Sequence, residues 1–305
     1  MKAIVLSETG APEQLRYSDA PDPVPDPGQA LVQVRAAGIN FLDVLVRQGR
    51  YPQPPPLPTI PGIELAGEVD GRRVMAVTGG GGGYAELAAV DVDRLVPLPD
   101  GASFVEGASF LMAFLTAWLP LTRQARVEPG SVVLVHAASG GVGSAAVQVA
   151  RHLGAHVVAT ASTDEKRELA LELGAHETYG YDEFAGQVRA DVVVDPVGGE
   201  IFADSLKTLN PLGVVIAIGF AAGMWAELNP ALLVGRNVGV QGFYLGRLMT
   251  HKWELVREAM LELVALWEQG AVRPVVGAEY ALADAADAQR LIEERRHRGK
   301  VVLVP

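Results

Sequence analysis

The stretch from Ser131 to Leu153 restricts the fold more than any other part of the chain. It reads SVVLVHAASGGVGSAAVQVARHL: an apolar run through His136, three glycines within four positions, and then apolar residues at helical spacing. Continuously apolar strands are typical of parallel sheets whose two faces are covered by helices. The stretch therefore predicts a strand over 131–136 and a helix over 144–153 within an α/β domain.

The second half of the chain repeats this alternation. Five further strands are expected at short apolar runs: His156–Thr160, Glu177–Tyr179, Asp191–Val194, Gly213–Ile218 and Val238–Gly242. Helices are expected at Asp164–Leu173, Trp253–Glu268 and Ala283–Glu294, and a last strand at Lys300–Val304. Six apolar strands alternating with helices predict a doubly wound parallel sheet. The first 110 residues instead show short β-like runs between proline- and glycine-rich turns, which predicts an irregular, mostly β domain.

Composition excludes several classes of function. A chain of 305 residues is long enough for two domains, and its net charge of −11 argues against general binding to nucleic acid or to anionic membranes. The chain has no cysteine, which excludes disulfides, thiolate metal sites and a cysteine nucleophile. The N-terminal segment lacks the apolar core of a signal peptide, and no run approaches the roughly 18 uninterrupted apolar residues of a membrane span. We expect a soluble, cytoplasmic protein.

The glycine segment predicts a dinucleotide site. The residues from Gly141 to Ala146 fit the pattern GxGxxG/A and lie between the expected strand and helix. The first glycine permits a tight turn, Gly143 lets backbone approach a pyrophosphate, and Ala146 lets helix and strand pack closely. The helix N-terminus offers free N–H groups to an anion. A glycine-rich turn without a ligand is the alternative, which the strand–turn–helix context disfavours.

The end of the next strand indicates which dinucleotide. NAD sites usually place Asp or Glu about 20 residues after the glycines, where it accepts from the ribose 2′-hydroxyl. Here that place is held by Ser162, and Lys166 follows one helical turn later. A hydroxyl and an ammonium suit a 2′-phosphate, so NADPH is expected rather than NADH. Lys166 could equally be an exposed helix lysine, and Asp164 is expected to cap the helix rather than bind ribose.

Several motifs together resemble a known family. HAASGGVG at 136–143, Gln148 and DPVGG at 195–199 resemble the medium-chain dehydrogenase/reductase superfamily, most closely its zinc-free quinone oxidoreductase (zeta-crystallin-like) branch. Further matches are GINFLD at 38–43 with Arg47, Gly49 and Tyr51, PGIELAGE at 61–68, GYAE at 83–86, LTAW at 115–118 and GKVV at 299–302. The resemblance extends over nearly the whole chain.

The resemblance implies a two-domain architecture. A GroES-like β-rich catalytic domain over 1–110, completed by 255–305, accompanies a Rossmann NADPH-binding domain over 111–254, with the site in the cleft between them. The resemblance also implies a homodimer formed by pairing the last Rossmann strand, from Val238 to Gly242, with its twin. An exposed apolar edge strand would otherwise invite aggregation, which supports this expectation.

The resemblance also bears on zinc. Zinc-dependent members carry a cysteine near the Gly38–Asn40 segment and a histidine just after the Pro–Gly pair, where this chain has Asn40 and Ile63. Neither an amide nor an alkyl side chain replaces thiolate or imidazole at tetrahedral zinc. The four-cysteine structural lobe is missing too. We therefore expect no metal site, and reduction of an electrophilic acceptor rather than alcohol oxidation.

The expected reaction is hydride transfer from NADPH to a quinone. Asn40 and then Tyr51 are the candidate donors to the oxygen that gains charge. A turn-capping amide and a half-buried aromatic are their alternatives. The candidate cofactor contacts are Thr116, Ser139, Gly140, Gly141, Val142, Gly143, Ser162, Lys166, Tyr181, Gly219, Phe220, Phe243 and Arg295. Within this set, the resemblance implies Tyr181 and Arg295 as contacts of the 2′-phosphate, and it implies Thr116, Gly219, Phe220 and Phe243 as residues beside the nicotinamide. A solvated helix end is the alternative for the arginine. Asp43 and Arg47 are expected to pair across one helical turn.

Other functions stay open. An NADPH-dependent alkenal or enone reductase would use the same scaffold. An NADPH-binding structural or RNA-binding protein with little catalysis is disfavoured by the net acidity. A Rossmann-type methyltransferase would need an acid at the place of Ser162. Two departures from the family, a short EVDGR loop after Glu68 and Leu45 in place of a tyrosine, leave the acceptor open.

Overall fold

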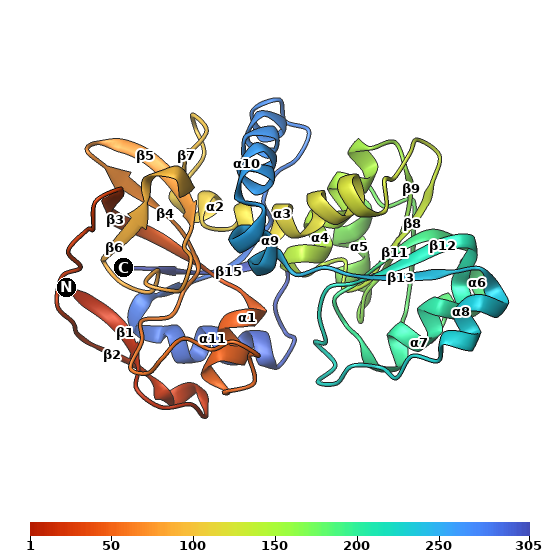
Figure 1. The fold of residues 1–305 in the computed structure, drawn as a ribbon, viewed down its shortest axis with the longest axis horizontal. Helices are drawn as coiled ribbons and strands as arrows, with labels where there is room; N and C mark the ends of the chain where they lie inside the picture. Colours follow the sequence, from red (N-terminus) through yellow and green to blue (C-terminus); the bar gives the residue numbers. More distant parts are fainter. The chain divides into compact units, whose positions relative to one another are not determined.

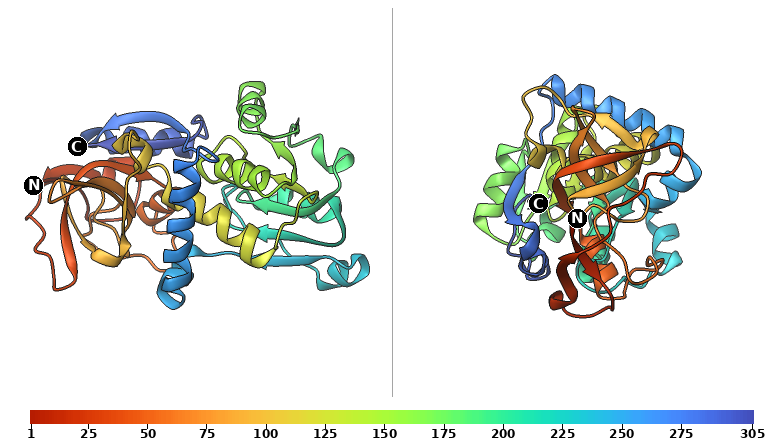
Figure 2. Two further views of the ribbon diagram at one scale, coloured as in Figure 1. Left: turned by 90° about the horizontal axis from the view of Figure 1, so that it is seen from above. Right: turned by 90° about the vertical axis from the view of Figure 1, so that its left-hand side faces the viewer.

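The computed structural model describes residues 1–305, which divide into two compact units. The first unit comprises Met1–Met112, Met260–Glu268 and Arg273–Pro305, and the second comprises Ala113–Ala259 and Gln269–Val272. From the sequence, the boundaries between the two domains were expected after residues 110 and 254. Both termini belong to the first unit and lie near each other in every view (Figures 1 and 2). Each unit is described by itself below.

The second unit is built on a six-stranded parallel sheet. Its strand order is β10 (Glu177–Tyr179), β9 (His156–Thr160), β8 (Val132–Val135), β11 (Ala190–Asp195), β12 (Leu209–Ala217) and β13 (Gly239–Gly242). All five neighbouring pairs are parallel. The chain starts at β8, moves outward to β10 and then returns past β8 to β11. The predicted doubly wound sheet is confirmed, with a reversal of order between β8 and β11.

Helices cover this sheet. They are α4 (Gly141–His152), α5 (Asp164–Glu172), α6 (Phe184–Gln187), α7 (Gly199–Thr208), α8 (Pro230–Arg236) and α9 (Leu245–His251). Of these, α4 packs on β8 and β9, α5 on β9 and β10, and α7 on β11 and β12. The central strands are mostly apolar and are fully buried at Val133, Leu134 and Val193. The apolar runs read from the sequence are thus the strands that helices cover on both faces.

The first unit is built on a mainly antiparallel sheet. Its order is β14 (Val276–Ala281), β15 (Lys300–Val304), β3 (Gln29–Ile39), β4 (Glu64–Val69), β5 (Arg72–Val77) and β7 (Leu95–Pro97), with β6 (Leu87–Asp91) also pairing with β3. A separate pair is formed by β1 (Lys2–Leu6) and β2 (Leu15–Asp19). The C-terminal strand β15 pairs with β3, Val301 facing Ile39 (Figure 1). The end of the chain thereby completes the sheet begun by its first residues.

Short helices flank the first unit's sheet. They are α1 (Phe41–Arg47), α2 (Phe104–Gly107) and α11 (Ala285–Glu293). The sequence had not predicted α1 as an element, nor β4, which begins with the charged Glu64 and contains Gly67. Two helices, α3 (Leu111–Leu119) and α10 (Trp253–Glu268), run from one unit into the other. Each of these two elements contains a carboxylate that the fold buries, Asp43 and Glu64, and an apolar pattern does not reveal such an element.

One helical segment is apolar enough to cross a membrane. Residues Phe104–Gln124 pass a test of length and composition, although no uninterrupted apolar run reaches the length of a span. Within its most apolar window, 78% of the residues are buried inside the protein. Burial in the protein itself accounts for this composition, because apolar side chains of a core helix are shielded from water without any membrane.

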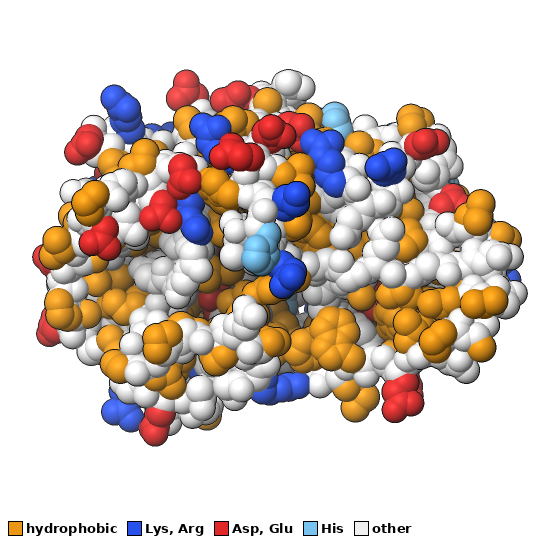
Figure 3. All heavy atoms as spheres, viewed as in Figure 1, with side chains coloured by type: hydrophobic (Ala, Val, Ile, Leu, Met, Phe, Trp, Pro, Cys, Tyr) orange, Lys and Arg blue, Asp and Glu red, His pale blue; other side chains and the backbone are white.

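Charges are mixed on the face that Figure 3 shows. Lysine and arginine side chains lie there among aspartates and glutamates rather than gathering into a basic patch. A nucleic-acid interface needs clustered positive charge. This face therefore gives no support to the RNA-binding alternative.

Candidate functional site

The glycine turn of the second unit lies between β8 and α4. The helix begins at Gly141, three residues earlier than the sequence predicted, so the glycines form its first turn. Gly140 occupies the N-cap position and provides no side-chain cap. The first N–H groups of a helix have no partners within it, and an uncapped N-terminus at the end of a parallel strand suits an anion. The predicted residues Ser139 to Gly143 thus lie together at one helix N-terminus.

Gly143 has a reason within the turn to be glycine. A Cβ atom at this position would lie 2.1 Å from the carbonyl oxygen of Ala137. Ala137 itself has a φ of 50°, in the left-handed region, so the loop folds back tightly over the helix start. The sequence assigned Gly143 to close approach by a pyrophosphate. The structure shows that the chain's own backbone already requires it.

Tyr181 reaches the same turn. Its hydroxyl oxygen accepts a hydrogen bond from the backbone N–H of Ala137 at 3.2 Å. The residue follows β10, the outermost strand, and its side chain is half-buried. The resemblance assigned Tyr181 to the 2′-phosphate, and the structure places its hydroxyl beside the glycine turn.

His136 joins the ends of β8 and β9 to α7. It is fully buried, with Nδ1 2.7 Å from Thr160 Oγ1 and Nε2 2.7 Å from Ser205 Oγ. Ser205 donates its only proton to the carbonyl of Ile201 at 2.6 Å, so it accepts from His136, and Thr160 in turn donates to Nδ1. Burial lowers the pKa of His136 to about 3, so the ring is neutral. Sequence reasoning quoted this histidine only as part of a motif.

The end of β9 carries no acid. Thr160 is buried, Ser162 is exposed, and Lys166 lies half-buried in the first turn of α5. The prediction that Asp164 caps this helix is wrong. The N-cap is Thr163, whose Oγ1 accepts from the N–H of Lys166 at 3.4 Å, whereas Asp164 is the first helical residue and pairs with Arg167. Thr163 precedes Asp164 by one position and its hydroxyl reaches the N3 amide of Lys166, so Thr163 is the N-cap.

A buried acid closes the turn after β11. Asp195 Oδ1 accepts from the N–H groups of Val197 and Gly198 at 2.7 and 3.0 Å, and burial raises the pKa of this carboxyl. Gly198 has a φ of 74°, and a Cβ there would lie 3.2 Å from the Cα of Phe220. The DPVGG motif is therefore a turn packed against the segment that contains Gly219 and Phe220.

The residues predicted to line the nicotinamide lie at several places. Gly219 and Phe220 follow β12, and Phe243 follows β13 and donates its N–H to Ala217 O at 2.9 Å. The carboxyl ends of parallel strands share one edge of a sheet, so these segments lie on the same edge as the glycine turn. Thr116 is buried within α3. Arg295 is exposed after α11 in the first unit, and its assignment to the cofactor stays a prediction.

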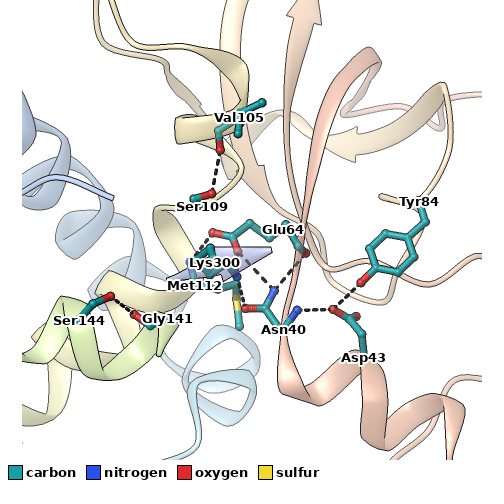
Figure 4. Close-up of polar contacts among 11 residues, drawn as sticks. Asn40, Asp43, Glu64, Tyr84, Val105, Ser109, Met112, Gly141, Ser144 and Lys300 are labelled. Atoms are coloured by element: carbon teal, nitrogen blue, oxygen red, sulfur yellow. Dashed lines mark hydrogen bonds and ion pairs between the residues drawn. The ribbon is translucent and has the colours of Figure 1, made fainter. Parts of the chain in front are cut away.

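The first unit holds a charged cluster at adjacent strand ends (Figure 4). Asn40 follows β3, Glu64 begins β4 and Lys300 begins β15. Lys300 Nζ donates to Glu64 Oε2 at 2.8 Å and to Asn40 Oδ1 at 2.7 Å, and Asn40 Nδ2 donates to Glu64 Oε2 at 3.3 Å. Glu64 is fully buried and Lys300 is 5% exposed, while Asn40 is half-buried. Sequence reasoning found Asn40 and missed both charged partners.

Asp43 supports Asn40 from the other side. Its Oδ2 accepts from the backbone N–H of Asn40 at 2.8 Å and from the hydroxyl of Tyr84 at 3.0 Å. Burial raises the pKa of Asp43 to about 6, and the pKa of Tyr84 lies well above its usual value for the same reason. Asn40 is the N-cap residue of α1, so both its backbone and its side chain are held.

The predicted pair between Asp43 and Arg47 does not form. Arg47 is 1% exposed; it donates to Gln289 Oε1 at 2.8 Å, forms an ion pair with Glu293 at 2.5 Å and contacts the carbonyl of Gly10. The helix-face argument assumed that both side chains lie in solvent. Because α1 is buried on this face, each finds a partner on another element.

Tyr51 lies partly buried against the core of the first unit. Its backbone N–H donates to Leu45 O at 3.2 Å, in the turn that follows α1. The ring is therefore the half-buried aromatic that the sequence allowed as an alternative. Contact with an acceptor stays a prediction for this residue.

Comparison with known proteins supports the resemblance read from the motifs. Residues 26–100 match the alcohol dehydrogenase GroES-like domain, and residues 141–265 match the zinc-binding dehydrogenase family. The chain is 34% identical over 328 residues to quinone oxidoreductase from Mus musculus, covering 100% of this chain and 98% of the relative.

Solved structures agree with this relationship. Quinone oxidoreductase from Thermus thermophilus, studied also in its complex with NADPH, is 41% identical with a TM-score of 0.91 and complete coverage of both chains. Escherichia coli quinone oxidoreductase complexed with NADPH is 30% identical with a TM-score of 0.92, again over 100% of both chains. The chain therefore belongs to the medium-chain dehydrogenase/reductase superfamily, in its quinone oxidoreductase branch.

Proposed function

We propose that the protein is a cytoplasmic, NADPH-dependent reductase that transfers a hydride to a quinone. The observation that carries the cofactor choice is the end of β9, where the exposed Ser162 holds the place at which NAD sites usually carry an acid for the ribose 2′-hydroxyl. The relatives solved with NADPH support the same choice. When bound, NADPH supplies the hydride, and the protein binds, orients and shields the reacting groups.

The residues of the second unit fit this cofactor. The uncapped first turn of α4 offers backbone N–H groups to the pyrophosphate. Ser162 and Lys166 provide a hydroxyl and an ammonium for the 2′-phosphate, and Tyr181 provides a phenol at the glycine turn. From the first unit, Arg295 is proposed to join this set. The nicotinamide is assigned to residues at the strand ends and in α3: Thr116, Gly219, Phe220 and Phe243.

The acceptor is assigned to the first unit. Reduction places negative charge on the acceptor oxygen, and a donor held at that oxygen lowers the barrier. Asn40 is partly exposed, and the two hydrogen bonds that its carboxamide nitrogen donates are long, 3.3 Å to Glu64 and 3.4 Å to Gly38 O. An acceptor oxygen can compete for such a donor. Tyr51 is the second candidate.

Cofactor titration and turnover test this proposal. NADPH and NADH are titrated against the protein, and the loss of reduced-nicotinamide absorbance is followed with 1,4-benzoquinone, 9,10-phenanthrenequinone and an α,β-unsaturated ketone. Tighter binding of NADPH together with quinone turnover is the expected result. If the protein turns over only the enone, its function would be reduction of a conjugated double bond rather than of a quinone. Absence of NADPH binding would overturn it, and binding without turnover would favour a structural role.

We also propose a homodimer. β13 is the last strand in the sheet order, so its outer edge has no partner strand within the chain. Exposed backbone edges of this kind pair readily with a second copy. Sedimentation equilibrium at micromolar concentration should give twice the chain mass of 32.2 kDa. A monomer mass at every concentration would exclude this assembly.

A further inference from the structure

The carboxamide of Asn40 is held by two buried charges of opposite sign. Its Oδ1 accepts from Lys300 Nζ at 2.7 Å, and its Nδ2 donates to Glu64 Oε2 at 3.3 Å (Figure 4). We propose that Lys300 and Glu64 are positioning residues, which set the orientation of the Asn40 amide so that it can donate to the acceptor oxygen. This inference rests on the proposed function, in which Asn40 contacts the acceptor.

The two charges distinguish the two orientations of the amide. An ammonium only donates hydrogen bonds and a carboxylate only accepts them. With Oδ1 toward Lys300 and Nδ2 toward Glu64, both contacts are attractive; after a 180° flip, both would be repulsive. The direction of the amide N–H bonds is thereby set by electrostatics rather than by packing.

The pair also strengthens the amide as a donor. The positive charge at Oδ1 draws electron density from the amide nitrogen, because hydrogen bonds in a chain polarise one another. The bonds made by Nδ2 are longer than the usual 2.9–3.0 Å of N–H···O contacts. Glu64 and the carbonyl oxygen of Gly38 already accept from the two N–H groups of Nδ2. An acceptor oxygen would therefore take the place of Gly38 O, whose contact at 3.4 Å is the longer one, while Lys300 still holds the oxygen side of the amide.

The charged pair of Lys300 and Glu64 is costly to keep in a core. Glu64 is fully buried, its Oε1 accepts from the N–H of Met112 at 2.8 Å, and Lys300 is 5% exposed. Burying two charges costs desolvation energy that their attraction repays only partly, so an apolar pair of similar size often stabilises a fold equally well. A role in orienting the partly exposed amide of Asn40 explains why Glu64 and Lys300 are charged at this place.

Lys300 is assigned to positioning rather than to contact with substrate. Two of its three N–H donors are used within the cluster, and its side chain is almost wholly covered. Asn40 is the least covered member of the cluster, since Glu64 is fully buried and Lys300 is 5% exposed. Any effect of Lys300 on the acceptor should therefore pass through Asn40.

A double-mutant cycle tests this dependence. The variants are N40A, the neutralised pair E64Q/K300M, and the triple variant; K300M alone is avoided because it leaves a buried carboxylate without its partner. We expect N40A to lower kcat for the quinone about 100-fold. E64Q/K300M should lower kcat about tenfold with the Kd of NADPH unchanged. In the N40A background, neutralising the pair should change kcat less than about twofold.

A matched pair controls for general loss of stability. R47M/E293Q removes another ion pair of the first unit, in which Arg47 is 1% exposed. This control should lower the melting temperature and leave kcat unchanged. K300R, which keeps a donor for Asn40 Oδ1, should recover part of the activity that the neutralised pair loses.

A spectroscopic readout is independent of turnover. The chain has four asparagines, Asn40, Asn210, Asn229 and Asn237. Selective ¹⁵N-asparagine labelling should give four pairs of side-chain amide signals, with Asn40 assigned by its loss in N40A. In E64Q/K300M the Asn40 signals should shift while the other three stay in place.

The outcomes separate this inference from the proposed function. Unchanged Asn40 signals in E64Q/K300M, or an equal loss of kcat from the pair in both backgrounds, would overturn the positioning role. Wild-type kcat in N40A would also overturn it while leaving the quinone reductase standing. If the wild-type protein reduces no quinone, the proposed function fails, and the amide signals alone decide whether the pair orients Asn40.

Discussion

Nδ1 of His136 lies 2.7 Å from Oγ1 of Thr160, so a buried neutral imidazole ties the end of β8 to the end of β9. The glycine turn follows the first of these strands and Ser162 follows the second. The distance between the proposed pyrophosphate and 2′-phosphate contacts therefore depends on this bond. His136→Leu should raise the Kd for NADPH and lower the free energy of unfolding by about 1–3 kcal/mol, since Thr160 and Ser205 lose their buried partner. His251→Leu, at an exposed position, is the matched control for both measurements.

The same histidine predicts a pH dependence. Its pKa is about 3 in the folded protein against an ordinary value of 6.5, so between these values the unfolded chain binds a proton that the folded chain does not. The stability that neutral His136 contributes is fully present above pH 6.5 and falls as the pH is lowered toward 3. Urea denaturation from pH 7 to pH 4 should show a smaller decrease for His136→Leu than for the wild type. If the free energy of unfolding falls equally with pH in both proteins, the assignment of a neutral ring is contradicted.

Asp43 should act in the opposite direction. Burial raises its pKa from 3.8 to about 6, so in this interval the folded protein holds a proton that the unfolded chain has lost. Its contribution is fully present below pH 3.8 and is lost as the pH rises through about 6. Between pH 4 and pH 7, Asp43→Asn should gain stability relative to the wild type by at most about 2–3 kcal/mol. Denaturation midpoints of the two proteins at both pH values measure this difference; a constant difference would count against it.

Gly143→Ala should remove cofactor binding. The added Cβ would lie 2.1 Å from Ala137 O, so the turn between β8 and α4 must open. We expect loss of NADPH binding in a fluorescence titration and a lower melting temperature. Gly235→Ala in α8 is the control, because nothing lies within 4 Å of its added methyl and alanine favours helix by about 1 kcal/mol. Unimpaired NADPH binding by Gly143→Ala would refute the tightness of this turn.

Ser162→Asp should change the cofactor preference. A carboxylate at the end of β9 repels a 2′-phosphate and can accept from a 2′-hydroxyl. The Kd for NADPH should rise about tenfold or more, equivalent to about 1.4 kcal/mol, while the Kd for NADH falls or stays unchanged. Ser162→Asn provides a control of similar size without the charge. Equal effects of both substitutions on the two cofactors would show that Ser162 does not face the 2′ position.

The sequence by itself determined the parallel sheet of the second unit. The bounds of β9 and β10 agree with the predicted ranges, the glycines lie at the predicted turn, and outside this sheet the bounds of α10 and β15 also agree. Strand and helix periodicity, apolar burial and glycine at a tight turn are local properties, so they can be read from neighbouring residues. The absence of an acid at the end of β9 was likewise visible in the sequence.

Only the tertiary structure decided which polar groups meet. Lys300 lies 260 residues from Asn40 along the chain, and they come together because β15 pairs with β3. Asp43 joins Tyr84 rather than Arg47, and Thr163 rather than Asp164 caps α5. The partner of a buried charge is chosen among all elements that surround it, because desolvation penalises every alternative that leaves it unpaired. That choice depends on how the strands are arranged in the sheet, which spacing along the chain does not specify.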